Sequence, residues 1–134
     1  MKKILSALAI LAFFSVSFTA CKKEKTKTTA EKIIGQWQVD NLMVNDHSNG
    51  ADHTISSNDF TSTDFYEFKT DGTVNISIKG DSGSTTYTLS GEDKLVITDD
   101  ETYDIKTLND HSLVLYFKDG DTNEYEEVTI TFKR

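Results

Sequence analysis

Few side chains in this 134-residue sequence are spaced for metal chemistry. Asp46-His47 and Asp52-His53 supply ligand types that zinc accepts, but they lie in a segment rich in Ser, Asn and Gly. A zinc site needs ligands that rigid elements hold in place. Asp119-Gly120-Asp121 begins like a calcium loop, yet Glu124 stands at the turn glycine and Ile130 at the twelfth position. We therefore predict no metal site and no cofactor.

Nucleophilic catalysis has equally little support. His111 and Ser112 are neighbours in a predicted strand, where consecutive side chains point to opposite faces and cannot form a nucleophile–base pair. The 22 acidic residues include no pair whose surroundings would separate their pKa values. The expectation is that the protein is not an enzyme.

The single cysteine, Cys21, follows a leader of characteristic composition. Lys2 and Lys3 come first, an apolar stretch covers 4–18, and small residues lead to the cysteine. This is the order of a secretory signal, and with cysteine as the first mature residue it resembles the lipobox of bacterial lipoproteins. The resemblance implies a signal peptide over 1–20 and a membrane anchor on lipidated Cys21. The alternative is an uncleaved transmembrane segment, for which the stretch is short.

Lipidation would leave no thiol for a disulfide, a nucleophile or a metal site. Lys22 follows the cysteine where an aspartate would mark inner-membrane retention in enterobacterial lipoproteins, so the resemblance implies the outer membrane. Lys-Lys-Glu after the cysteine distantly resembles surface-export signals of Bacteroidetes lipoproteins. Both the periplasmic and the cell-surface face stay open.

Charge divides the rest of the chain into two parts. Residues 21–32 contain five lysines, two glutamates and no large apolar side chain, which predicts a flexible tether after the lipidated cysteine. Removing the lysines and glutamates of leader and tether from 14 basic and 22 acidic residues leaves seven basic and 20 acidic in 33–134, a net charge of −13. Such a surface repels phosphates, so we predict no nucleic-acid partner.

From Gly35 onward, apolar and polar residues alternate in short runs, the pattern of half-buried strands. Val74, Ile76 and Ile78 are an example, and Asp71-Gly72 before them is a hairpin signal. The pattern predicts little or no helix and eight strands, near 36–44, 64–69, 73–79, 84–90, 94–98, 101–107, 112–118 and 124–133.

Short connections join these strands, which favours up-and-down order. An open sheet would expose two edges, whereas closure removes both and leaves room for side chains or one small ligand. We therefore predict an all-β domain over 33–134, an eight-stranded antiparallel up-and-down barrel, with a sandwich as the alternative. The longest break, 45–63, either covers the barrel mouth with Ile55 and Phe60 or is an unstructured loop.

Gly35-Gln36-Trp37, at the entry to the first strand, matches the Gly-x-Trp motif of lipocalins. Residues 68–73 (FKTDGT) resemble a hairpin of small lipocalin-like domains in Bacteroidetes lipoproteins. The resemblance implies a lipocalin-like barrel whose closed end holds Trp37 beneath a cation, here Lys133 or Arg134. The family's Thr-Asp-Tyr motif is missing from the sequence, which speaks against a full-size calyx.

Aromatic residues on the inward face of the predicted strands are the candidates for ligand contact, because aromatic walls with a few hydroxyls suit an apolar molecule. The alternative is that they simply fill the core. The candidates are Trp37, Tyr66, Phe68, Tyr87, Tyr103 and Phe117.

Two functions follow from these expectations. The first is a membrane-anchored lipocalin-like lipoprotein that binds a small apolar molecule in its barrel. The second is a protein-interaction module, such as an inhibitor, immunity or envelope-assembly lipoprotein, with a filled core. Acidic loops near Asp99-Asp100-Glu101 and Asp119–Glu127 would then attract a basic envelope protein.

Overall fold

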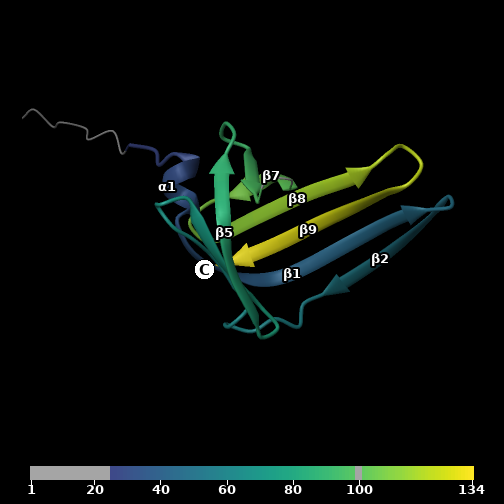
Figure 1. Cartoon of the computed structure of the whole chain (residues 1–134), viewed down its shortest axis with the longest axis horizontal. Coiled ribbons are helices and arrows are strands. Elements are labelled where there is room, and N and C mark those ends of the chain that lie inside the picture. The colour runs from purple at the N-terminus through teal and green to yellow at the C-terminus, as the bar shows by residue number, and fades with distance from the viewer. Residues whose placement is uncertain (1–24, 99–100) are drawn as a thin grey trace, which may run out of the picture.

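The computed structural model describes residues 25–98 and 101–134, so the leader and Cys21 lie outside the described residues. The described chain forms one short helix and nine strands (Figure 1). Their bounds are α1 Thr29–Ile33, β1 Gly35–Ser48, β2 Ala51–Ser57, β3 Phe65–Phe68, β4 Thr73–Ile78, β5 Asp81–Leu89, β6 Lys94–Ile97, β7 Glu101–Leu108, β8 Ser112–Gly120 and β9 Tyr125–Lys133.

Eight of the strands close into an antiparallel barrel. Sheet order runs β1-β3-β4-β5-β6-β7-β8-β9, and β9 returns to pair with β1. The fold is therefore the predicted all-β, up-and-down barrel, and each of the eight predicted strands is present with its ends moved by up to four residues. β1 serves both closing partners because its 14 residues are long enough to pair with β3 near Trp37 and with β9 further on.

The segment 45–63 departs from the expectation of one long connection. Its first residues continue β1, and Ala51–Ser57 form the additional strand β2 beside them. Asn49 and Gly50 make the turn with φ values of 53° and 74°, the left-handed geometry of the tight hairpins that Asn-Gly favours. The described chain thus has the eight predicted barrel strands and one additional strand, β2, that the sequence pattern did not predict.

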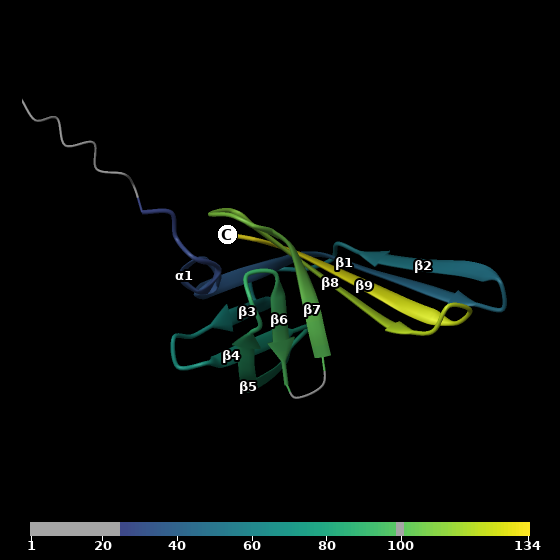
Figure 2. The same cartoon turned by 90° about the horizontal axis from the view of Figure 1, so that it is seen from above.

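Three strands, β1, β8 and β9, extend beyond the barrel together. The distal parts of β1, β8 and β9, with β2 at the edge, form a four-stranded sheet ordered β8-β9-β1-β2. This sheet extends beyond the barrel on the right of Figures 1 and 2. We call it, over residues 43–57 and 116–129, the arm.

Side chains fill the barrel interior at the end nearest α1. This packing removes the largest apolar groups from water, which is the main source of stability for a domain of this size. The most deeply buried side chains are Trp37, Phe68, Phe132, Ile33, Leu95, Leu113, Leu115, Val39 and Val74.

One arginine closes this end of the barrel. The Arg134 guanidinium lies 3.8 Å from the centre of the Trp37 ring, and it donates to the carbonyl oxygens of Ile34 at 3.0 Å and Lys32 at 2.9 Å. Trp37 Nε1 donates to the carbonyl of Ile33 at 2.8 Å. The expected cation on Trp37 is confirmed, and Arg134 supplies it.

Gly35 leaves space for this arrangement. Its φ is 115°, a backbone conformation that side chains disfavour, and a Cβ there would lie 3.3 Å from an Arg134 nitrogen. The glycine of the Gly-x-Trp motif is therefore needed both for its backbone and for the arginine beside it.

The helix α1 begins inside the range expected to be a tether. Thr28 and Glu31 form a capping box: the Glu31 amide donates to the Thr28 hydroxyl, and the Thr28 amide donates to the Glu31 carboxylate. Ile33, at its other end, is fully buried. In the described part of the tether range, ordered structure starts at Thr29. In residues 25–98 and 101–134, the single helix, α1, lacks the length and apolarity to span a membrane.

Replacing Arg134 by lysine should lower the free energy of unfolding by about 1–3 kcal/mol, because an ammonium cannot stack on Trp37 and bind two carbonyls together. Chemical denaturation of the full chain measures this. Lys133→Ala, which removes a surface ion pair with Asp40, is the control and should cost about 1 kcal/mol or less. Equal losses in the two variants would show that the stack adds nothing.

Candidate functional site

The end of the barrel away from α1 is open and apolar. A recess of about 140 Å³ lies there, lined by side chains of β1, β3, β4, β9 and the loop before β3. A second hollow of about 320 Å³ lies along β4 and β5. Ile78 lines both, so they adjoin. The lining residues of the first are Val39, Leu42, Phe60, Tyr66, Ile78 and Ile130; those of the second are Ile76, Ile78 and Asp81–Thr85. We call the two together the mouth.

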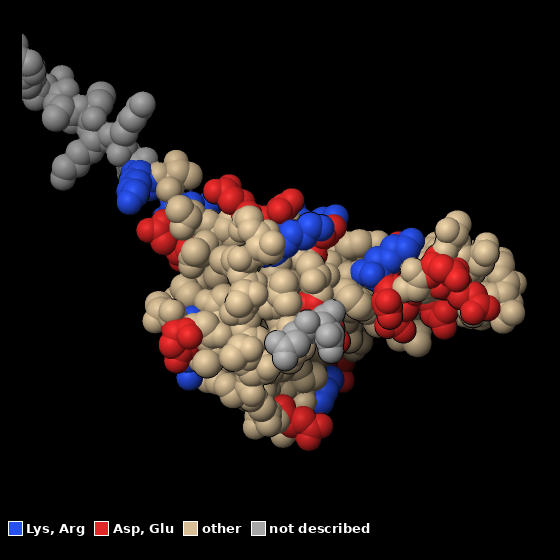
Figure 3. All heavy atoms as spheres, turned by 45° about the horizontal axis from the view of Figure 1, so that its top comes forward, with Lys and Arg blue, Asp and Glu red and all other residues tan. Residues whose placement is uncertain are grey.

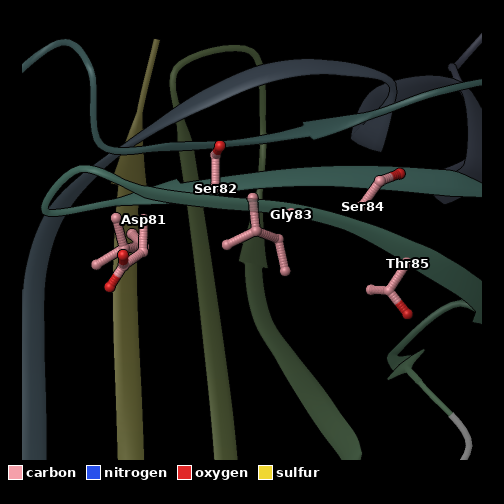
Figure 4. Close-up of a pocket in the computed structure, with 7 residues that line it drawn as sticks. Asp81, Ser82, Gly83, Ser84 and Thr85 are labelled. Carbon is pink, nitrogen blue, oxygen red and sulfur yellow. The ribbon is translucent and has the colours of Figure 1, made fainter.

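Incomplete strand pairing opens the wall beside the second hollow. β5 pairs with β6 only over Tyr87–Leu89, so 81–85 has a strand partner on one side, β4, among the described residues. In Figure 4, Ser82 and Ser84 point to one side of β5, whereas Asp81 and Thr85 point to the other. A Cβ added to Gly83, opposite Ile76, would meet no atom within 4 Å. Because Gly83 has no side chain to cover it, Ile76 is only half-buried.

A short loop, 58–64, covers part of the mouth. Phe60 packs against the core from this loop, with the Lys79 ammonium 5.0 Å from its ring centre. The expectation of a lid is met by these residues alone. Ile55, the other proposed cover, is 70% exposed on β2 and does not lie over the recess.

Asp64 holds this loop in place. The residue is 2% exposed, and its carboxylate accepts hydrogen bonds from the Thr61 amide at 2.7 Å and the Lys79 amide at 2.5 Å. These backbone bonds, that of Thr61 first, lower the pKa of the Asp64 carboxyl because they favour its charged form. One buried carboxylate therefore joins the loop to the β4–β5 turn.

Half of the predicted aromatic set lies in the filled core. Trp37 is under Arg134, and Phe68 packs edge-on against Tyr87 with ring centres 5.0 Å apart. The Tyr87 hydroxyl donates to the carbonyl of Lys69 at 2.8 Å. These side chains support the barrel from the closed end and do not line the mouth.

The other half lies nearer the opening. Tyr66 lines the smaller recess and packs on Phe132, while Tyr103 packs on Phe117 with ring centres 5.5 Å apart. Burial raises the pKa values of Tyr66 and Tyr103, with a further contribution from Glu101. Both phenols are therefore neutral near pH 7. Of the six aromatic candidates, Tyr66 is the one that contributes to the recess.

The remaining lining residues were not singled out from the sequence as ligand contacts. Ile76, Ile78 and Ile130 belong to strands whose alternation already points them inward. Gly83 gives no such signal, because its importance depends on what lies opposite it.

The strand pairing separates the residues that suggested a metal site. His47 pairs with Asp52 and Asp46 with His53 across the β1–β2 hairpin, so the two pairs occupy opposite faces. His47 Nδ1 lies 2.5 Å from an Asp52 oxygen. Within residues 25–98 and 101–134, no three His, Asp or Glu side chains are grouped to hold a metal ion.

The acidic sequence at 119–124 ends β8 and forms a hairpin tip. Asp121 accepts hydrogen bonds from the amides of Asn123 and Glu124 at 2.8 and 3.0 Å. Its carboxylate thus stabilises the turn.

The geometry defines a closed eight-stranded antiparallel barrel with one additional strand, a filled core and an apolar mouth. Comparison of the sequence with protein-family models finds no match, and comparison with curated proteins finds none either.

Asp64→Asn should loosen the loop, because an amide side chain offers one acceptor oxygen where the carboxylate serves two backbone amides. Hydrogen exchange of the Thr61 and Lys79 amides should be faster than in the wild type. Asp59→Asn, an exposed carboxylate beside Lys79, is the control and should leave exchange at Thr61 unchanged.

The Asp64 carboxylate also predicts that the stability of the loop depends on pH. The pKa of the Asp64 carboxyl is lowered in the folded state. Its contribution to stability is therefore complete above the unfolded pKa of about 3.9 and is lost as the pH falls through the folded pKa. Acid titration followed at the Phe60 ring by NMR should report the change, and Asp64→Asn should abolish it. An unchanged titration in the variant would contradict the assignment.

Proposed function

We propose that this chain is a lipocalin-like lipoprotein, anchored through Cys21, that binds a small apolar molecule at the mouth of its barrel. The observation that carries the proposal is the apolar mouth centred on Ile78, with Phe60 over one side of it. Concave apolar surfaces with few polar groups are the usual form of small-molecule sites. A binding role, without catalysis, fits this chemistry.

The filled core limits how a ligand would enter. Sites that enclose a drug-sized molecule have volumes of roughly 300–1,000 Å³, whereas the recess inside the mouth holds about 140 Å³. Such a recess takes one end of a molecule, and the rest would lie along the open hollow of β4 and β5. The proposed ligand is therefore held at the rim and not enclosed in a deep calyx.

The position of the tether supports a consistent orientation. The chain enters the barrel through α1 at the closed end, next to Arg134. An anchor on Cys21 would therefore attach to the closed end, with the mouth at the opposite end of the barrel. With the outer membrane as the proposed location, ligands would reach the mouth from the aqueous side, whether that side is periplasmic or extracellular.

The filled core also favours a second candidate, a protein-interaction module. Trp37, Phe68 and Phe132 are fully buried at the closed end, and the acidic surface would attract a basic envelope protein. An inhibitor, immunity or envelope-assembly lipoprotein would fit this description. Binding at the mouth by a small molecule separates the two candidates.

Gly83→Leu should block the mouth, because its side chain would project over Ile76 into space that is empty in the wild type. The test is methyl NMR of the isoleucines in the full chain, held in phosphatidylcholine nanodiscs and titrated with decyl maltoside below its micelle-forming concentration. In the wild type, the Ile78 and Ile130 signals should shift saturably, and those of Ile33 should not. The shifts should be lost in Gly83→Leu.

Thr86→Leu is the control, since Thr86 is exposed on the opposite face of β5 and lies outside the lining of both hollows. It should bind like the wild type. Absence of saturable shifts in the wild type, or equal binding by both leucine variants, would contradict the proposed site.

Cys21→Ala should abolish incorporation of an alkyne-tagged fatty acid in growing cells and should release the protein from the outer-membrane fraction. Lys22→Ala is the control and should still be labelled. Labelling that persists in Cys21→Ala would contradict the proposed anchor.

A further inference from the structure

The inner face of the arm continues the apolar lining of the mouth. Side chains alternate along strands, so residues two positions beyond buried Leu115 and Ile130 share their face. On each strand of the arm, one apolar residue occupies this place. Paired directly across β8, β9, β1 and β2, they form what we call the apolar row: Phe117, Val128, Val44 and Ile55.

The apolar row is incompletely covered. Phe117 packs on Tyr103 at the barrel end, but Ile55 at the far end is 70% exposed, one of two large apolar side chains that stand open to solvent in the described chain. Leu42 and Ile130, which line the mouth, lie in the preceding row. The apolar surface therefore runs without interruption from the mouth onto the arm.

Carboxylates form the next row outward. Asp119, Glu126 and Asp46 are directly paired across β8, β9 and β1, and His53 follows on β2. We call these three carboxylates the acidic row. Acidic side chains gather over the arm in Figure 3. Like charges at directly opposed positions are destabilising, so the fold retains the acidic row at a cost.

The carboxylates on the two faces of the arm differ in whether they have ion-pair partners. On the outer face, Glu127 contacts Lys118 and Asp52 contacts His47. Within the described residues, none of the three carboxylates of the acidic row has an ion-pair partner. The inner face thus presents uncompensated negative charge beside an exposed apolar strip.

We propose that the ligand of the mouth is a cationic amphiphile, a molecule with an alkyl chain and an ammonium head. The chain would lie over the apolar row with its end at Ile78, and the head would rest on the acidic row. Successive rows are about 6.7 Å apart along the strands, so the acidic row lies about 13 Å from the row of Leu42, within reach of a decyl chain. This inference rests on the proposed function and names the class of its ligand.

The test compares three probes with the same decyl chain: decylammonium, decyl maltoside and decyl sulfate. Each is titrated into the full chain in phosphatidylcholine nanodiscs, with the Ile55 and Ile78 methyl signals as the readout. Decylammonium should bind about tenfold more tightly than decyl maltoside, decyl sulfate should bind most weakly, and the preference should decrease with salt. The Ile55 signal should shift together with that of Ile78.

Two double variants locate the charge that is recognised. Asp46→Asn/Glu126→Gln neutralises an opposed pair of the acidic row, and Glu92→Gln/Asp93→Asn makes the same change at the closed end. The first should lose most of the tenfold preference and have a higher melting temperature without ligand, because it relieves like-charge repulsion. The second should keep the preference.

The outcomes separate this inference from the proposed function. If no probe shifts the Ile78 signal, the proposed function fails and the inference fails with it. If all three probes bind equally, or both double variants behave alike, the mouth binds apolar chains and the cationic assignment is overturned. Ile55 shifts that depend on protein concentration without any probe would assign the face to a second copy of the chain and would also overturn it.

Discussion

The stack of Arg134 on Trp37 is the interaction on which the rest of the structure depends. The stack joins the first and last strands at the place where the sheet must close. The same guanidinium donates hydrogen bonds to carbonyl oxygens at the end of α1, which the helix itself leaves unpaired. Gly35 has no side chain to obstruct it. Because this end is sealed, any access to the barrel is confined to the opposite end.

The lengths of the strands determine the shape of the open end of the barrel. β3 and β6 have four residues each, while β1 has 14 and β8 and β9 have nine. The short strands make a small barrel that side chains fill, and β1, β8 and β9 continue beyond it. The apolar surface that a larger barrel would enclose is therefore displaced to the rim and onto the arm.

The sequence pattern predicted most of the fold because one face of each barrel strand is buried, which produces visible alternation. β2 was missed for the opposite reason: both of its faces are largely exposed, so Ala51–Ser57 has no alternation to detect, and Asn49-Gly50 was its remaining signal. The cation on Trp37 was predictable from the motif. The mouth at Gly83 was not, because it arises where β5 and β6 fail to pair, which is a property of the assembled sheet.

The two faces of the arm differ in how their charged side chains are paired. On its outer face, Glu127 and Asp52 each contact a neighbouring side chain, Lys118 and His47 respectively. The inner face opposes like charges and exposes Ile55, two choices that lower the stability of the free protein. Local conflict of this kind concentrates at functional sites. A ligand that covered the apolar row and neutralised the acidic row would remove the exposure of Ile55 and the repulsion between like charges at once. For this reason we assign the proposed ligand to the inner face.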